Sequence, residues 1–133
     1  MTRVDFYVGQ EGTRKELLAC RLAEIAYQRG HKVLIVAPQD QLAALDDLLW
    51  TFGAGTFVPH GPYGQDEPVQ LAPTEPENGD VLITLSPELP QHAEGFTRVV
   101  EIVGGSEAEK SAARPRFRYY REKGMMPTVH TLP

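Results

Sequence analysis

The sequence has very little cysteine and no long apolar run. Cys20 is the single cysteine in 133 residues, so an internal disulfide is excluded and a reducing compartment is expected. No apolar stretch approaches the length of a membrane span. The opening segment MTRVDFYVGQ is not a signal peptide, because its apolar run is short and is interrupted by Asp5. We therefore expect a cytoplasmic protein that makes no membrane contact.

The sequence also lacks the short motifs of common enzymes and cofactor sites. It contains no G-x-x-x-x-G-K-[ST] loop, and the glycines of VGQEGT (8–13) do not fit G-x-G-x-x-G. The four histidines are scattered and have no partners at zinc-binding spacing. No G-x-S-x-G motif is present, and Asp46 and Asp47 point in different directions on a predicted helix. We expect no enzyme activity, no cofactor and no metal.

Positive charge is missing from the middle of the chain. All thirteen Lys and Arg residues lie within 3–32 and 98–123, whereas ten acidic residues lie between these ranges. Residues 106–124 carry six basic and three acidic side chains, a net charge of +3 in a chain whose total is −5. The rest of the chain therefore carries −8. We predict a localised basic patch on an acidic protein, which argues against a general DNA-coating role.

Strand and helix signals alternate along the chain. The predicted strands are 3–8, 31–37, 56–60, 80–86, 97–103 and a last edge strand from 128. The predicted helices are one that opens with a Thr13–Glu16 capping box and ends at Gly30, one over 40–52, and one over 106–124 that opens with a Ser106–Glu109 capping box. We predict an α/β fold, in one domain over 1–133, with a mostly parallel sheet and helices on both faces.

One segment stands apart from this alternation. Residues 61–79 contain four prolines and several acids, and we predict an irregular surface loop there.

The last predicted helix combines cations with an aromatic ring. Lys110, Arg114, Arg118 and Arg121 are spaced 4, 4 and 3 and so line one face, with Phe117 beside them. Such a row suits an acidic peptide with an apolar anchor. It equally suits single-stranded nucleic acid, with bases stacked on aromatic side chains of the same helix: Phe117, Tyr119 or Tyr120. The simplest alternative is a solvated helix face whose aromatic rings belong to the core.

Pro115 falls inside this predicted helix, where it removes a backbone hydrogen bond. The sequence therefore predicts either a kink or a new helix that starts near Arg114, with Pro115 in its first turn.

Aromatic residues gather in a second place. Trp50, Phe52, Phe57 and Tyr63 lie around the predicted end of the second helix and the short strand that follows. The pattern alone slightly favours a core position for each. An exposed Trp50 or Phe57 would instead be an anchor for a protein partner.

Four segments, spread in order over nearly the whole chain, match a known family. They are DFYV (5–8), HKVLIVAPQDQLAALDDLLW (31–50), TFVPHG (56–61) and EKSAARPRFRYYREKGM (109–125). Together they resemble the chi subunit of bacterial DNA polymerase III, a part of the clamp-loader complex, and TFVPHG is the most specific of them.

The resemblance implies a Rossmann-like three-layer sandwich without nucleotide binding or catalysis, and it implies two partners. One is the acidic C-terminal tail of single-stranded DNA-binding protein (SSB), which ends in an apolar residue and a carboxylate. The other is the psi subunit of the clamp loader, or a helicase that competes for the same face. On this interpretation the chain is an adaptor with no strong DNA binding of its own; the alternative is a module that binds single-stranded nucleic acid through 106–124.

The resemblance also assigns residues to each partner. Those for the SSB tail are Val103, Lys110, Arg114, Phe117 and Arg118, and the spacing adds Arg121. Those for psi are Trp50 and Phe57. Phe117 stands where the family has tyrosine, so the ring is kept and the hydroxyl is lost.

Overall fold

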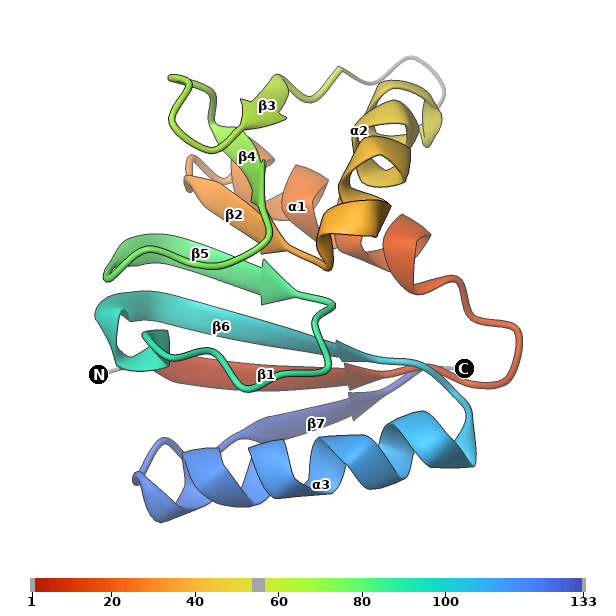
Figure 1. Cartoon of the computed structure of the whole chain (residues 1–133), viewed down its shortest axis with the longest axis vertical. Helices are drawn as coiled ribbons and strands as arrows, with labels where there is room; N and C mark the ends of the chain where they lie inside the picture. The colour runs from red at the N-terminus through yellow and green to blue at the C-terminus, as the bar shows by residue number, and fades with distance from the viewer. Residues whose placement is uncertain (1, 54–56, 133) are drawn as a thin grey trace.

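The chain is built around a seven-stranded sheet in which every pairing of neighbouring strands is parallel (Figure 1). The structure is a computed structural model that describes residues 2–53 and 57–132. The strand order is β3-β4-β2-β5-β6-β1-β7. The strands are β1 (Arg3–Val8), β2 (Val33–Val36), β3 (His60–Pro62), β4 (Val69–Ala72), β5 (Gly79–Thr84), β6 (Phe96–Val103) and β7 (Thr128–Thr131).

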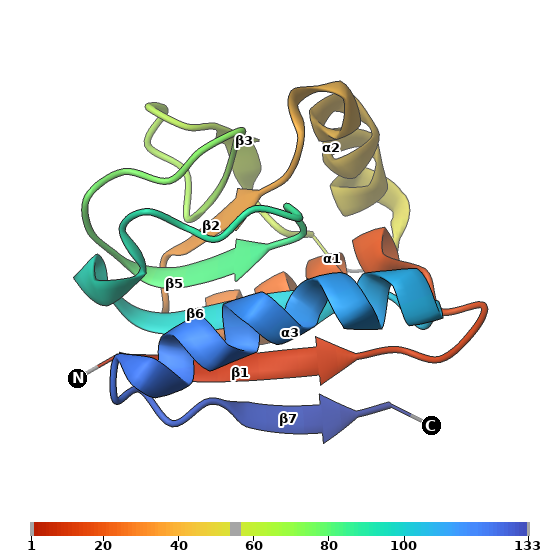
Figure 2. The same ribbon diagram turned by 60° about the horizontal axis from the view of Figure 1, so that its bottom comes forward.

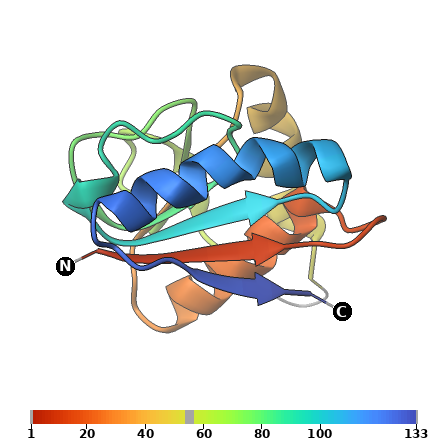
Figure 3. The ribbon, with the colours of Figure 1, turned by 90° about the horizontal axis from the view of Figure 1, so that it is seen from below.

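Helices cover both faces of this sheet. One face carries α1 (Lys15–Gln28), the short 3-10 turn η1 (Gln39–Gln41) and α2 (Leu42–Thr51); the other carries α3 (Glu107–Glu122). Figure 3 shows α3 on one side of β6, β1 and β7 and α1 on the other. The predicted α/β sandwich is confirmed. No helix among the described residues is long and apolar enough to cross a bilayer.

The alternation of side chains along the strands divides the core in two. Val4 and Phe6 of β1 pack in the layer under α3, whereas Val100 and Ile102 of β6 pack in the layer under α1. The buried face of α1 is made of small residues, among them Cys20, which let the helix lie close to the sheet. Burial raises the pKa of the Cys20 thiol to about 12, with a smaller contribution from Glu16, so Cys20 is an inert core residue as predicted.

Three local predictions are wrong. The predicted strand over 56–60 is displaced: β3 begins at His60, and Thr56 lies outside the described residues. The predicted loop 61–79 contains β4, whose Val69 and Leu71 are buried between β3 and β2. Prolines flank β4 on both sides and are typical of a loop, so the sequence did not predict this strand. It is identified by its pairing with β3 and β2. The hydroxyl of Thr13 does not cap α1, because it accepts the Gln10 N–H at 3.0 Å.

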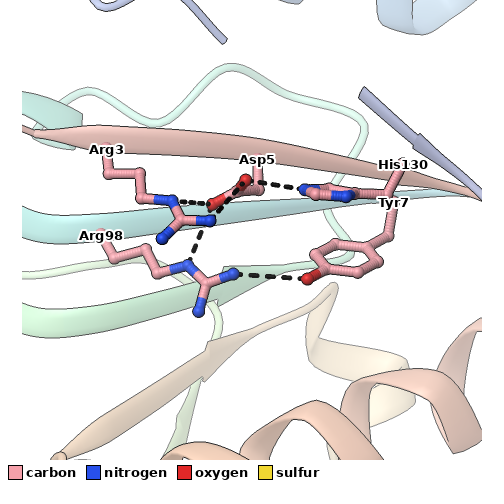
Figure 4. A network of polar contacts seen from close by, with 5 residues as sticks. All are labelled: Arg3, Asp5, Tyr7, Arg98 and His130. Carbon is pink, nitrogen blue, oxygen red and sulfur yellow. Dashed lines mark hydrogen bonds and ion pairs between the residues drawn. The ribbon is translucent and has the colours of Figure 1, made fainter. Parts of the chain in front are cut away.

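A buried carboxylate holds the last strand to the sheet (Figure 4). The side chain of Asp5 is fully buried, and one oxygen lies 2.8 Å from His130 Nε2 while the other lies 3.0 Å from both Arg3 Nε and Arg98 Nε. Burial alone would raise the pKa of Asp5, but the His130 hydrogen bond and the two arginines outweigh it and lower that pKa. Tyr7 stacks on His130 at 4.6 Å and accepts from Arg98 at 3.3 Å. These two arginines are thus engaged by a buried carboxylate.

Candidate functional site

The helix that carries most of the candidate residues is capped by hydrogen bonds at both ends. The Ser106 hydroxyl accepts the Glu109 N–H at 3.1 Å, so the predicted cap is confirmed at the start of α3. At the far end Gly124 adopts φ 80°, which a side chain disfavours, and its N–H reaches Arg121 O at 3.0 Å. These caps fix the length of the helix and therefore the positions of its side chains.

Pro115 does not divide this helix. α3 is one helix over Glu107–Glu122 (Figure 2), so the predicted new start near Arg114 is wrong. The carbonyl that Pro115 leaves without a partner belongs to Ser111, four residues earlier. Ser111 is exposed, so this part of the helix is open to solvent. Continuity across Pro115 keeps the side chains before and after it in one helical register.

The inner face of α3 contains a buried ion pair. Arg116 Nε lies 3.2 Å from Glu101 Oε1 of β6, and the Tyr120 hydroxyl donates to Glu101 Oε2 at 2.8 Å. A second nitrogen of Arg116 donates to Pro87 O at 2.9 Å. Burial raises the pKa of Glu101 to about 7, although Arg116 and Tyr120 act in the opposite direction. This network orients α3 on the sheet, and our sequence analysis missed it.

The outer face of α3 presents the predicted cations together. Arg114, Arg118 and Arg121 are exposed, and among the described residues none of them has a carboxylate within ion-pair distance. Lys110 Nζ lies 3.9 Å from Glu107, a loose surface pair. Phe117 is half-buried, edge-to-face with Phe6 at 5.5 Å, and the Arg121 guanidinium lies 5.9 Å from its ring centre. We call this surface the α3 face.

Val103 does not reach the α3 face. Only 3% of it is exposed, because alternate residues of β6 point at α3 and are covered by it. It lines a cavity of about 240 Å³ on the other flank of the helix, with Ala112 and Arg116. Val8, its register partner on β1, and Phe117 are only partly buried and pack on the same core. Of these two, Phe117 is the one that contacts a cation of the α3 face.

The aromatic residues after α2 form a second exposed surface. Trp50 is 56% exposed and Phe57 64%, and their ring centres are 5.6 Å apart. Tyr63 is 55% exposed, whereas Phe52 is half-buried against the core. The pattern-based preference for core positions is therefore wrong for Trp50, Phe57 and Tyr63. We call the surface between α2 and β3 that carries these three residues the α2–β3 face.

A histidine supports the tryptophan of this face. His60, whose side chain is fully buried, lies under Trp50 with ring centres 4.7 Å apart. Its Nδ1 donates to Val58 O at 2.7 Å, and its Nε2 lies 3.3 Å from Asp46 of α2. His60 Nε2 has no hydrogen-bond partner among the described residues, so the ring acts mainly by packing between β3 and α2 beneath the indole. An aromatic ring that already packs on one face loses less conformational freedom when a partner covers the other.

Comparisons with known proteins agree with this architecture. Residues 1–128 match the model of the family described as DNA polymerase III chi subunit, HolC. The chain is 41% identical to a DNA polymerase III subunit chi of Pseudomonas aeruginosa, with 100% of this chain and 99% of the relative covered. It is 35% identical to the Escherichia coli subunit (82% and 80% covered) and 32% identical to that of Haemophilus influenzae (82% and 81%). The chain belongs to the DNA polymerase III chi subunit family.

Proposed function

We propose that the chain is a non-catalytic adaptor of the replisome. In this role the α3 face binds the acidic C-terminal tail of SSB, and the α2–β3 face binds the psi subunit of the clamp loader. The observation that carries the proposal is the row of exposed arginines that have no carboxylate partner in the part of the chain that the structure describes, whereas Arg3, Arg98 and Arg116 each pair with a buried carboxylate. Such an adaptor would act in the cytoplasm, where bacteria replicate their DNA.

The proposed tail site combines charge with a small apolar surface. Arg114 and Arg118 offer planar forks that hold carboxylates through paired hydrogen bonds. Lys110 and Arg121 add positive charge at either end of the row. Val8 and Phe117 offer partly exposed apolar surface for the apolar residue at the end of the tail. A partly buried arginine–carboxylate contact contributes about 1.5–3 kcal/mol, and a fully solvated one about 0–1 kcal/mol.

The α2–β3 face fits a role as a protein interface. Large aromatic side chains are common among binding hot spots, and Trp50 is exposed while one side of its ring packs on His60. Psi is the partner that we propose, and a helicase that competes for Trp50 and Phe57 is the second candidate for the same surface.

The alternative function, direct binding of single-stranded nucleic acid by α3, is less well supported. Tyr120 is fully buried, so it has no face on which a base could stack. Phe117 and Tyr119 are only partly exposed. The acidic remainder of the protein would repel a phosphate backbone. A short acidic peptide needs only the local patch.

Peptide titration tests the proposal. A fluorescent peptide that copies the last ten or so residues of the same organism's SSB is titrated with wild type, Arg114→Ala and Arg21→Ala. Arg21 is an exposed arginine on α1, so its removal makes the same change in net charge at another place. We expect binding that only Arg114→Ala weakens, by about tenfold.

The outcomes separate the two functions. Equal loss in both variants would mean that only net charge matters. Binding of a bare oligonucleotide together with no binding of the peptide would favour the alternative function.

A further inference from the structure

A cavity of about 500 Å³ lies between the C-terminal half of α1 and the strands β5, β6 and β1. We call it the α1 cavity. It is on the opposite side of the sheet from α3, and none of the residues that we assign to the α3 face or the α2–β3 face lines it. Sites for small molecules have volumes in this range. The α1 cavity is therefore separate from both proposed interfaces.

One wall of the α1 cavity is apolar. Strands β5 and β6 and the helix α1 contribute aliphatic side chains to it: Val81, Ile83, Val100, Leu22, Ile25 and Ala26. The strand residues are buried, whereas Ile25 is 44% exposed. Such a wall can cover the apolar part of a ligand that enters from solvent.

The rest of the α1 cavity is rich in hydrogen-bond donors. Arg3 of β1, Arg98 of β6 and Arg29 at the end of α1 all line it. Asp5 and Tyr7 engage the Nε and Nη2 atoms of Arg3 and Arg98, so their Nη1 atoms have no hydrogen bond to the described residues. In Figure 4 one terminal nitrogen of each guanidinium is reached by no dashed line. The Arg29 side chain has no ion pair or hydrogen bond within the described part of the chain.

Two carboxylates lie near these arginines without cancelling their charge. Asp5 is fully buried, does not line the cavity and is shared with His130. Asp80 lines the cavity, but one of its oxygens accepts the Lys32 N–H at 3.2 Å and lies 3.1 Å from His31 Nδ1. Counting both acids against the three arginines still leaves one positive charge. Unpaired donors and a positive charge together favour an anionic ligand.

The end of α1 is compatible with an anion nearby. Free carbonyl groups at the C-terminus of a helix would repel negative charge. Three of the last four carbonyls of α1, those of Ile25, Ala26 and Tyr27, accept N–H groups from Arg29, Gly30 and His31. Gly30 permits this closure because it adopts φ 86°.

We propose that the α1 cavity binds a small amphipathic anion. Its carboxylate or phosphate group is held by the three arginines, because guanidinium groups bind both through paired hydrogen bonds. Its apolar body lies against the aliphatic wall. A neutral apolar molecule would leave the donors unpaired, and a small anion without an apolar body would leave the wall uncovered. This site goes beyond the proposed function, since it uses neither interface.

Nuclear magnetic resonance with matched ligands tests the site. Isotope-labelled wild type is titrated with octanoate, octyl phosphate, octanol and acetate, and the shifts of the backbone amides are followed. We expect saturable binding of at least one octyl anion, with a dissociation constant of roughly 1 mM, and shifts at Ile25, Arg29 and Thr97. Octanol should bind about tenfold more weakly, and acetate should not saturate. The two octyl anions distinguish a carboxylate site from a phosphate site.

A variant at an exposed residue tests the cations without disturbing the fold. Arg29→Ala removes a guanidinium that has no partner among the described residues, whereas removal of Arg98 would also release the buried Asp5. We expect Arg29→Ala to weaken binding of the octyl anion about threefold to tenfold and to leave octanol binding unchanged. The matched control is Arg14→Ala at the other end of α1, which changes the net charge equally and should alter neither ligand.

The contrary outcomes are distinct. Octanol binding as tightly as the octyl anions would show that the cavity recognises apolar surface alone. Amide shifts that map outside the α1 cavity, or no saturable binding of either anion, would overturn the site. Each of these results leaves the proposed interfaces untouched, because those are tested with other variants and other partners.

Discussion

The α3 face and the α2–β3 face differ in the kind of side chain that they expose and in how those side chains are held. On α3, exposed arginines project into solvent from a helix that a buried Glu101–Arg116 pair fixes to the sheet. On α2–β3, Trp50 rests on the buried side chain of His60, which also lies 3.3 Å from Asp46. The first arrangement favours attraction of a flexible acidic peptide, and the second favours close packing of apolar anchors. The two proposed partners would therefore meet different surfaces and would not compete.

The largest expected effect concerns the support of the α3 face. Because the pKa of Glu101 is raised from 4.5 to about 7, the folded protein holds a proton there that the unfolded chain has released between these values. Stability therefore falls as the pH rises through this window, by up to about 3 kcal/mol. Glu101→Gln has no carboxyl group to titrate and does not lose this stability. As the pH rises, the unfolding free energy of the variant should therefore increase relative to that of wild type. Urea unfolding of both proteins from pH 4.5 to 7.5 measures it, and a constant difference would contradict the prediction.

The next effect separates the two faces. Trp50→Ala removes the indole that His60 supports, and we expect it to weaken psi binding by about 2 kcal/mol or more, roughly 30-fold. Binding of the SSB tail should not change. Isothermal titration calorimetry with each partner measures both affinities. Ile25→Ala, a change at an exposed apolar residue on α1, is the control. Loss of both partners in Trp50→Ala would mean that the faces are coupled.

Salt sharpens the comparison. Contacts among solvated charges are screened at high ionic strength, whereas packed apolar anchors are not. Between 50 and 300 mM NaCl we expect the dissociation constant for the SSB tail to rise about tenfold and that for psi to rise much less. Anisotropy titrations at four salt concentrations would show it. An equal salt dependence of the two dissociation constants would contradict this difference between the faces.

The smallest effect tests the geometry of the arginine contact. Arg114→Lys keeps the charge but replaces a planar fork by a point charge. We expect tail affinity to fall about threefold, less than the loss in Arg114→Ala. Identical affinities for wild type and Arg114→Lys would show that charge alone is recognised.

Much of the fold was predictable, because strands and helices in this chain mostly have clear boundaries. The apolar run before Ala37 and the caps around α3 predict β2 and α3 within a few residues. β4 was missed because its four residues are defined by the strands on either side rather than by its own pattern. Prolines near both ends made the segment look like a loop.

The candidate site was predictable on one face only. The spacing of Arg114, Arg118 and Arg121 placed them on one side of a helix whatever that helix packs against. The exposure of Trp50 was not predictable from spacing, because it depends on which elements pack beside α2. Glu101 is an acid within an apolar strand, which indicates that a buried partner should neutralise it. The sequence does not identify that partner as Arg116, because this requires knowing that α3 packs over β6.

A bridging assay tests the adaptor most directly. Single-stranded DNA coated with SSB is immobilised, and the retention of labelled psi is measured in the presence of wild type, Arg114→Ala or Trp50→Ala. We predict that psi is retained only with wild type, because each variant lacks one of the two contacts. Full retention of psi with either variant would contradict the account, since the bridge would then not depend on the corresponding face.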